Sequence, residues 1–364
     1  QRIIKWGEIV ESEKNKLRKK VLLFSREYPP NIVGGTAIVA RSTAEGLTKL
    51  DYIVTVISTC IGRETEREEI NGVDVLFVGT SAIYMDHSNF ETQVLRNHKH
   101  IVDVTLKEVD RPDIILVPDV FSFPEARIIA KKYGVKLINI LLQDFSKMTL
   151  YDKNGSHKVT DYANANEEDL LKIEKKSVIY SDMNVFISNA LAQSIIERYS
   201  LNKDKCRTIH LGIDFSELKA DSYSKIPNFI GEKEGKTFAT IGRMVPIKGF
   251  DSLIRAFKIV HEKYENTFLY LMGRGPEVEY LNGLIEESGL TQCIKIFYEK
   301  DRKKTIEYMR ACDYAVVPSL WESFCYVAAE FMALEKPLIV NGVDSLNELM
   351  IDNNQIRDYL RETF

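Results

Sequence analysis

The stretch from Val317 to Glu330 reads V-P-S-L-W-E-S-F-C-Y-V-A-A-E, which predicts a buried strand end, a polar turn and then a helix. We expect Ser323 to cap that helix, so that its first N–H groups form an anion site beside the strand end. Glu322 and Glu330 are about two helical turns apart, which places both acids near one stripe. This combination is typical of a nucleotide-sugar site, although an ordinary strand–helix unit with an exposed capping Glu explains the stretch equally well.

Length and composition narrow the classes of function. The chain has 364 residues, 45% of them hydrophobic and 28% charged, which is a soluble globular profile with room for two domains. The formal net charge of -4 argues against nucleic acid as a partner. The five cysteines are scattered, which favours reduced thiols and a cytoplasmic setting. No His or Cys spacing indicates a metal, so we expect none.

Residues 1–20 form a separate N-terminal extension with a helical pattern and a basic end. One interpretation is a weak peripheral contact with the inner face of an anionic membrane. A solvated helix that leads into the first strand is the interpretation we favour.

From residue 21, short apolar runs alternate with longer helix-like segments, which predicts parallel sheets covered by helices on both faces. The alternation stops in a Ser-, Lys-, Glu- and Gly-rich segment and then restarts. We therefore expect an acceptor-side Rossmann-like domain at 21–213, a linker at 214–236 and a nucleotide-sugar-binding Rossmann-like domain at 237–364. Two doubly wound domains facing a central cleft give the expected α/β architecture, since ligands bind where strand carboxyl ends meet such a cleft.

The predicted elements have definite bounds. The strands are expected at Val21–Phe24, Ile53–Ile57, Val73–Val78, Ile114–Val117, Leu137–Leu142, Asn184–Ile187, Thr208–Leu211, Thr237–Ile241, Thr267–Met272, Cys293–Phe297, Tyr314–Val317 and Leu338–Val340. The helices are expected at Ala37–Leu50, Glu91–Glu108, Pro124–Tyr133, Glu167–Tyr180, Ala190–Tyr199, Asp251–Tyr264, Val278–Ser288, Lys303–Arg310 and Phe324–Leu334.

Three turns after strands carry binding signals of unequal strength. The strongest is Gly242-Arg243-Met244-Val245-Pro246-Ile247-Lys248-Gly249, whose two cations fit a diphosphate better than they fit an ordinary basic surface turn. The turn at Gly273 and Arg274 resembles a nucleotide-binding turn but is equally well explained as a tight turn. The pair Gly34-Gly35 precedes a helix and lets a ligand approach the backbone closely, or else is a flexible loop tip.

Together these segments resemble the family 4 glycosyltransferases, which have the GT-B fold. The matching segments are E-Y-P-P-N-I-V-G-G near the start, S-N-A-L-A at 188–192, L-G-I-D at 211–214, G-R-M-V-P-I-K-G at 242–249, M-G-R-G-P-E at 272–277 and V-P-S-L-W-E-S-F with Glu330. The resemblance extends from about residue 21 to about residue 350, and the order of its motifs makes it specific.

The resemblance implies roles for individual residues. Arg243 and Lys248 would hold the donor diphosphate, Glu322 the hydroxyls of the donor sugar, and Glu330 the ribose hydroxyls. Arg243, Lys248 and Glu322 are therefore the expected catalytic residues. The remaining donor contacts are expected from Gly34, Gly35, Gly242, Gly273, Arg274 and the backbone N–H groups of Ser323, Phe324 and Cys325.

The sequence also departs from the family pattern. Gln143-Asp144 stands where many relatives have His-Asp, and Asp119 follows a strand end that often carries histidines. We assign Asp119, Gln143 and Asp144 to the acceptor side. Cys325 replaces a glycine of the family, and the C-terminal part is short.

The resemblance implies a retaining transfer of a hexosyl unit from a nucleoside-diphosphate sugar to an acceptor hydroxyl. The donor, UDP- or GDP-linked, would be a co-substrate in a metal-independent reaction that needs no cofactor. The acceptor would be a glycan, a lipid-linked molecule or a small molecule. The alternative is a catalytically silent GT-B relative that binds nucleotide sugars or serves as a partner subunit, an idea motivated by Gln143 and the short C-terminus.

Overall fold

The computed structural model forms two compact units. The first unit contains Gln1–Phe145, Asn164–Ile187 and Ala192–Ile209, and the second contains Ser146–Ala163, Ser188–Leu191 and His210–Phe364. The residues that the structure describes are 18–31, 35–80, 90–147, 149–151, 157–159, 167–213, 218 and 235–350.

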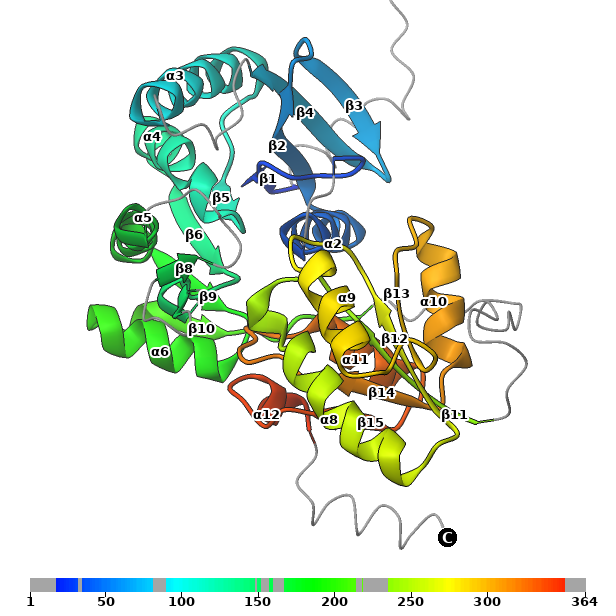
Figure 1. Ribbon diagram of the computed structural model, residues 1–364. Helices are drawn as coiled ribbons and strands as arrows, with labels where there is room; N and C mark the ends of the chain where they lie inside the picture. Colours follow the sequence, from blue (N-terminus) through cyan, green and yellow to red (C-terminus); the bar gives the residue numbers. More distant parts are fainter. Residues whose placement is uncertain are drawn as a thin grey trace, which may run out of the picture. The chain divides into compact units, whose positions relative to one another are not determined.

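The first unit is built on an eight-stranded sheet with the order β10-β9-β6-β5-β1-β2-β4-β3 (Figure 1). Its strands are β1 Lys20–Phe24, β2 Ile53–Ile61, β3 Glu66–Ile70, β4 Val73–Thr80, β5 Ile114–Val117, β6 Lys136–Leu141, β9 Met183–Phe186 and β10 Cys206–Thr208. Neighbouring strands are parallel except β3, which pairs antiparallel with β4. The expectation of a wholly parallel sheet is therefore wrong at this edge. The reason is the turn Asn71-Gly72, where both residues have positive φ and the chain closes a tight hairpin.

Helices cover both faces of this sheet because its strands are apolar on both sides. Leu22 and Phe24 pack into one buried cluster, while Val21 and Leu23 pack into the other. The helices of the first unit are α2 Gly35–Lys49, α3 Phe90–Glu108, α4 Phe123–Tyr133, α5 Glu167–Tyr180 and α6 Asn189–Tyr199, the last of which begins in the second unit. The short turns η2 Val120–Ser122 and η3 Phe145–Lys147 follow β5 and β6.

The second unit contains a five-stranded parallel sheet with the order β13-β12-β11-β14-β15. Its strands are β11 Lys236–Ile241, β12 Thr267–Met272, β13 Ile294–Phe297, β14 Tyr314–Val317 and β15 Leu338–Val340. The helices are α8 Phe250–Lys263, α9 Val278–Glu287, α10 Arg302–Ala311, α11 Tyr326–Ala333 and α12 Leu346–Leu349. A two-stranded hairpin, β7 Thr149–Tyr151 with β8 His157–Val159, completes the described strands.

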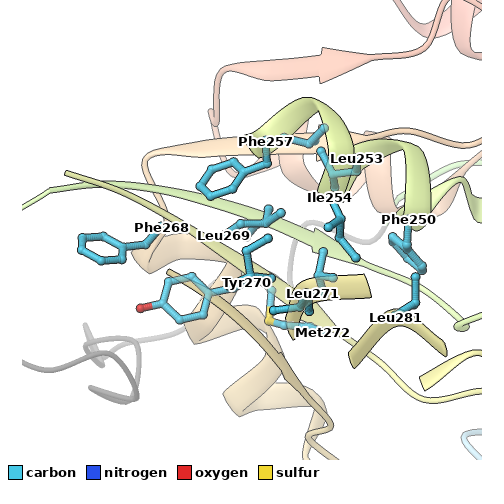
Figure 2. Packing of buried hydrophobic residues seen from close by; sticks show 14 of the residues in the cluster. Phe250, Leu253, Ile254, Phe257, Phe268, Leu269, Tyr270, Leu271, Met272 and Leu281 are labelled. Carbon is cyan, nitrogen blue, oxygen red and sulfur yellow. The ribbon is translucent and has the colours of Figure 1, made fainter. Parts of the chain in front are cut away.

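The interior strand β12 anchors the core of the second unit. All six of its residues are buried, and Leu269 and Leu271 have no exposed surface. Figure 2 shows Phe250, Ile254 and Phe257 of α8 in the same cluster of buried side chains. Their spacing along α8 follows the helical repeat, so one face of the helix is buried against the sheet. The rigid sheet fixes the loops at its carboxyl edge.

Several expected elements differ from the structure in their bounds, and two of these differences change the interpretation of the sequence. Residues 208–211 were expected to form a strand, but β10 ends at Thr208 and covers Cys206–Thr208. The helix expected at Phe324–Leu334 begins instead at Tyr326, and its N-cap residue is Cys325, not Ser323. Cys325 has φ 76°, a left-handed conformation that interrupts the chain before the helix starts. Glu322 therefore lies in the preceding loop, and the expected shared helical stripe with Glu330 does not exist.

Candidate functional site

The candidate site lies at the carboxyl edge of the five-stranded sheet, where the strand order reverses. β12 and β13 lie on one side of β11, and β14 and β15 lie on the other. The turn that starts at Gly242 follows β11, and the loop that starts at Pro318 follows β14. Ligands of open parallel α/β sheets bind at such a reversal point, because the two chain segments diverge there. The sheet therefore brings the basic turn and the acidic loop to one place.

The turn after β11 is locked to the loop after β14. The backbone N–H of Leu320 donates to the Ile247 carbonyl at 2.8 Å. Gly249 has φ 66°, and a Cβ atom there would lie 2.3 Å from the Pro318 carbonyl oxygen. Only glycine satisfies both requirements, because it lacks a Cβ atom and tolerates positive φ. This close approach sets the position of Lys248 beside the acidic loop.

Lys248 and Glu322 form the central ion pair of the site. The Lys248 Nζ donates to Glu322 Oε1 at 2.6 Å, and Ser319 Oγ donates to the same oxygen at 2.7 Å. The Glu322 side chain is 10% exposed and the Lys248 side chain 23% exposed. Both of these donors bind Oε1, and neither of them binds Oε2. The arrangement fixes a carboxylate and an ammonium group within reach of a ligand that approaches this edge of the sheet.

The loop around Glu322 is also held by hydrogen bonds from the segment that follows β15. Ser345 Oγ donates to the Glu322 carbonyl at 2.7 Å, and Asn341 Nδ2 donates to the Ser319 carbonyl at 3.2 Å. The Cys325 side chain is buried, and burial together with the nearby Glu322 charge raises the pKa of its thiol. The Cys325 thiol is therefore neutral here, and it also hydrogen-bonds Glu322.

The second acid, Glu330, is paired with a residue that the sequence analysis did not identify. Arg302, the first residue of α10, donates through NH2 to Glu330 Oε1. The Glu330 side chain is 11% exposed and the Arg302 side chain 46% exposed. Arg302 follows β13 by a short loop, so its position at the same sheet edge was the available signal. The N-cap Asp301 accepts from the backbone N–H of Lys303 and fixes where α10 begins.

The turn after β12 packs directly against the turn after β11. A Cβ atom at Gly273 would lie 1.9 Å from the Gly242 carbonyl oxygen, and one at Gly275 would lie 2.4 Å from the Met244 carbonyl oxygen. Packing between the two turns therefore requires glycine at both positions, without any contact to a ligand. Arg274 is exposed, and its guanidinium lies 4.8 Å from the centroid of the Tyr298 ring. Arg243 is also exposed.

The acids assigned to the acceptor side are held by internal contacts of the first unit. Asp119 accepts from the backbone N–H and the Nε of Arg26, from the Phe121 N–H and from Ser122 Oγ. It also caps η2. Four donors therefore occupy this carboxylate, which stabilises the loop after β5.

Asp144 is similarly occupied. Both terminal nitrogens of Arg198 donate to its two oxygens, at 2.7 and 2.8 Å, and Ser194 Oγ donates at 2.6 Å. Arg198 also lies 3.2 Å from Glu174, so one guanidinium holds two carboxylates that are each 1% exposed. Its neighbour Gln143 is partly buried and has partners of its own.

The glycine pair after β1 is only partly described. Gly34 lies outside the described residues, and Gly35 is the exposed first residue of α2, where a Cβ atom would meet nothing within 4 Å. No grouping of three or more metal-binding side chains occurs in the described part of the chain. Among the same residues, no helix is both long and apolar enough to cross a membrane.

Comparisons with known proteins identify the family of the chain. Residues 33–217 match the family described as Glycosyltransferase Family 4, and residues 223–358 match Glycosyl transferases group 1. An uncharacterized glycosyltransferase of Methanocaldococcus jannaschii is 27% identical over 343 residues, which cover 91% of this chain and 82% of that protein.

Two solved structures share the fold. Sucrose-phosphate synthase from Thermosynechococcus elongatus superposes with a TM-score of 0.74 at 17% identity, over 92% of this chain and 84% of that one. The catalytic domain of starch synthase IV from Arabidopsis thaliana, bound to ADP and acarbose, gives 0.69 at 16% identity, over 92% and 85%. At these identities the likeness establishes the GT-B architecture alone.

Proposed function

Because this chain belongs to glycosyltransferase family 4, we propose that it moves a hexosyl unit from a nucleoside-diphosphate sugar to an acceptor hydroxyl, with retention at the anomeric carbon. The proposed acceptor is a glycan, a lipid-linked molecule or a small molecule. The observation that carries the proposal is the Lys248–Glu322 pair at the reversal point of the second sheet. Such a pair offers a cation to a phosphate and a carboxylate to sugar hydroxyls.

The proposed diphosphate contact follows from charge. Lys248 is held at the sheet edge by the locked turn, and the exposed Arg243 follows the same strand. Arginine and lysine together match a diphosphate, since guanidinium binds two oxygens and ammonium acts as a point charge. A donor phosphate would then lie near Lys248, where the charge of Glu322 is already compensated.

The proposed sugar contacts use the two acids differently. Glu322 would accept hydrogen bonds from hydroxyls of the donor hexose, and Glu330 would accept from the ribose hydroxyls. A carboxylate accepts several hydrogen bonds at once, so a partner cation does not exhaust it. Arg302 would keep Glu330 oriented when the nucleoside is absent.

The proposed reaction places charge where the cations are. The bond between the anomeric carbon and the phosphate oxygen breaks, the bond to the acceptor oxygen forms on the same face, and the acceptor proton passes to the leaving phosphate oxygen. Negative charge grows on the diphosphate as it leaves, and Arg243 and Lys248 stabilise that charge. We propose that these two side chains make the reaction metal-independent, so that chelators leave turnover unchanged.

The catalytically silent alternative rests on Gln143, which stands where relatives carry a histidine. In the first unit this residue is partly buried, and glutamine can still hydrogen-bond a hydroxyl. An active enzyme and a silent binder differ in whether bound donor is consumed.

One experiment tests the proposal and separates the alternative. Purified protein is screened with ADP-, UDP- and GDP-hexoses by thermal shift, and nucleoside diphosphate release is then measured for each sugar that binds. We expect one donor to raise the melting temperature and to be consumed. Arg243→Ala should remove both effects, while Arg255→Ala on the exposed side of α8 should remove neither. A shift without release under any acceptor mixture would favour the silent binder.

A further inference from the structure

Helices α4 and α5 of the first unit expose three large apolar side chains. Ile128 on α4 is 49% exposed, and Ile179 and Tyr180 on α5 are 46% and 51% exposed. The two helices pack against each other, and they lie next to one another in Figure 1. The Arg127 guanidinium lies 3.5 Å from the centroid of the Tyr180 ring, so the apolar groups of the two helices belong to one surface. We call this the α4–α5 surface.

The same surface is rich in cations. On α4 the exposed lysines Lys131 and Lys132 follow Ile128 by three and four residues, so all three share a helical face. On α5 the exposed lysines Lys175 and Lys176 precede Ile179 with the same spacing. Together with Arg127, they surround the apolar side chains with positive charge.

The acids of α4 and α5 whose side chains the structure describes are buried or paired. Glu125 on α4 and Glu174 on α5 are 1% exposed and point into the unit. Asp182, just after α5, is paired with Lys136 at 2.8 Å. At the other end of α5, Glu168 and Asp169 are both paired with Lys172. Within the described residues, none of the four lysines of the α4–α5 surface takes part in an ion pair.

The local charge is therefore opposite in sign to that of the whole chain, whose formal net charge is -4. A general attraction to anions does not follow from the composition, so any such attraction has to come from a particular surface. Cations alone would suit many anionic partners. The exposed isoleucines and tyrosine argue against a nucleic acid as the anionic partner, because a nucleic acid gains little from contact with aliphatic groups.

We propose that the α4–α5 surface binds an anionic lipid bilayer. Lysine side chains of this surface reach the headgroups, while Ile128, Ile179 and Tyr180 enter the boundary between headgroups and acyl chains. Tyrosine suits this boundary, since its ring is apolar and its hydroxyl is polar. None of residues 1–20, for which a membrane contact was also considered, belongs to the α4–α5 surface as defined, and residues 1–17 lie outside the described structure.

A second helix supplies an internal contrast. On α8 of the second unit Ile259 is 71% exposed, and Tyr264 at its C-terminal end is 57% exposed, so these apolar side chains are individually more exposed. However, the charges there are mixed, because the acids Glu262 and Glu265 are exposed beside the cations Lys258 and Lys263. Anionic lipid repels such acids, so the charge pattern assigns the bilayer to the α4–α5 surface and not to α8.

The test measures binding of the full chain to vesicles of phosphatidylcholine alone and of phosphatidylcholine with about one third phosphatidylglycerol, by flotation. We expect binding to the anionic vesicles that weakens as salt is raised. The variant K131Q/K132Q/K175Q/K176Q should lose at least about tenfold in partition coefficient, since each lysine near an anionic surface contributes favourably. Circular dichroism confirms that each variant is folded.

The matched control is K258Q/K263Q/K303Q/K304Q, which removes the same four charges from exposed positions on α8 and α10. It should bind as the unmodified protein does. The variant I128S/I179S should also weaken binding, and here the loss should persist at high salt because it removes apolar contacts. Equal losses in the two four-lysine variants, or equal binding to neutral and anionic vesicles, would overturn the proposal. Displacement of the vesicles by a short RNA would overturn it as well.

Discussion

The carboxylates at the strand ends of the two sheets are held in different ways. In the first unit, Asp119 accepts from four donors and Asp144 from three, and every donor belongs to a neighbouring residue of that unit. In the second unit, the side chain of Glu322 accepts from Lys248 and Ser319, and both reach a single oxygen. The other acid of the second unit, Glu330, is paired with Arg302, whose side chain is 46% exposed.

The difference indicates which carboxylates are structural and which are available to a ligand. A carboxylate whose oxygens are both used by donors of the protein contributes to stability, and it would lose those contacts on binding a substrate. A carboxylate that shares one oxygen with its donors keeps acceptor capacity. We therefore expect changes in the first unit's acids to alter folding, and changes in the second unit's pairs to alter donor use.

The largest effect should come from breaking the buried network of the first unit. Arg198→Met leaves Asp144 and Glu174 without their shared cation, and removal of one partner from a buried ion pair costs about 3–5 kcal/mol. Urea unfolding measures the loss. An Arg207→Met control, at an exposed position on β10, should change stability little. A loss below about 1 kcal/mol would show that the network is not structural.

The second effect concerns the donor site. Lys248→Met should lower kcat/KM by about 10²–10³-fold, as removal of a group that stabilises transition-state charge does. Stability should fall much less than in Arg198→Met, because Glu322 keeps its bond from Ser319 and is more exposed than Asp144 and Glu174. Lys258→Met on α8 serves as the matched control and should retain full activity. A Lys248→Met enzyme with normal kinetics would remove the distinction between the two units.

The third effect is smaller and sharpens the role of Arg302. Arg302→Gln should raise the KM for the donor by roughly tenfold, because the Glu330 carboxylate loses the group that orients it. If Arg302 acts only through Glu330, Arg302→Gln should have no further effect in a Glu330→Gln background, and a double-mutant cycle measures this coupling. Simple addition of the two effects would mean that Arg302 touches the donor independently.

The fourth effect concerns backbone strain beside Glu322. Cys325 has φ 76°, and a left-handed conformation costs a non-glycine residue about 1–2 kcal/mol. Cys325→Gly relieves this cost, whereas Cys325→Ala keeps it, and both lose the thiol. The glycine variant should therefore be more stable than the alanine variant by about 1 kcal/mol in thermal or urea unfolding. The reverse order would show that packing of the side chain outweighs the backbone conformation.

The smallest effect is a pH dependence that belongs to the first unit. Burial, with help from the Asp144 charge, raises the pKa of Glu174 despite its bonds from Phe145 and Tyr199. The folded state therefore holds the proton more readily than the unfolded chain, in which the pKa of Glu174 is about 4.3. The contribution of this group to stability falls as pH rises above that value. In Glu174→Gln that fall is absent. The free energy of unfolding of the unmodified protein, minus that of the variant, should therefore decrease as pH rises. Urea unfolding at several pH values from acid to neutral measures this difference.

The bounds of some strands were predicted correctly from the hydrophobic pattern alone. The strands Ile114–Val117, Thr267–Met272 and Tyr314–Val317 have the predicted bounds, because continuous apolar runs between turn residues have few alternatives. The hairpin strand β3, Glu66–Ile70, was missed because its exposed charged residues carry no apolar pattern. Its signal was the Asn71-Gly72 turn.

The helix after β14 illustrates the opposite case. Serine is a favoured cap, so local preference pointed to Ser323, yet the helix begins at Tyr326. The loop is held by Ser345, Asn341 and the contact of Gly249 with Pro318, all distant in sequence. Tertiary contacts override a local preference that is worth only about 1 kcal/mol.

The sequence by itself determined the fold class, the family and the placement of Arg243, Lys248 and Glu322 after strands and of Glu330 in the following helix, because periodicity and motif order are local properties. Only the tertiary structure decided which side chains meet. Lys248 lies 2.6 Å from Glu322, Arg302 holds Glu330, and Arg198 occupies Asp144. These pairs join residues far apart in the chain, and the strand order that brings them together is set by the packing of whole sheets.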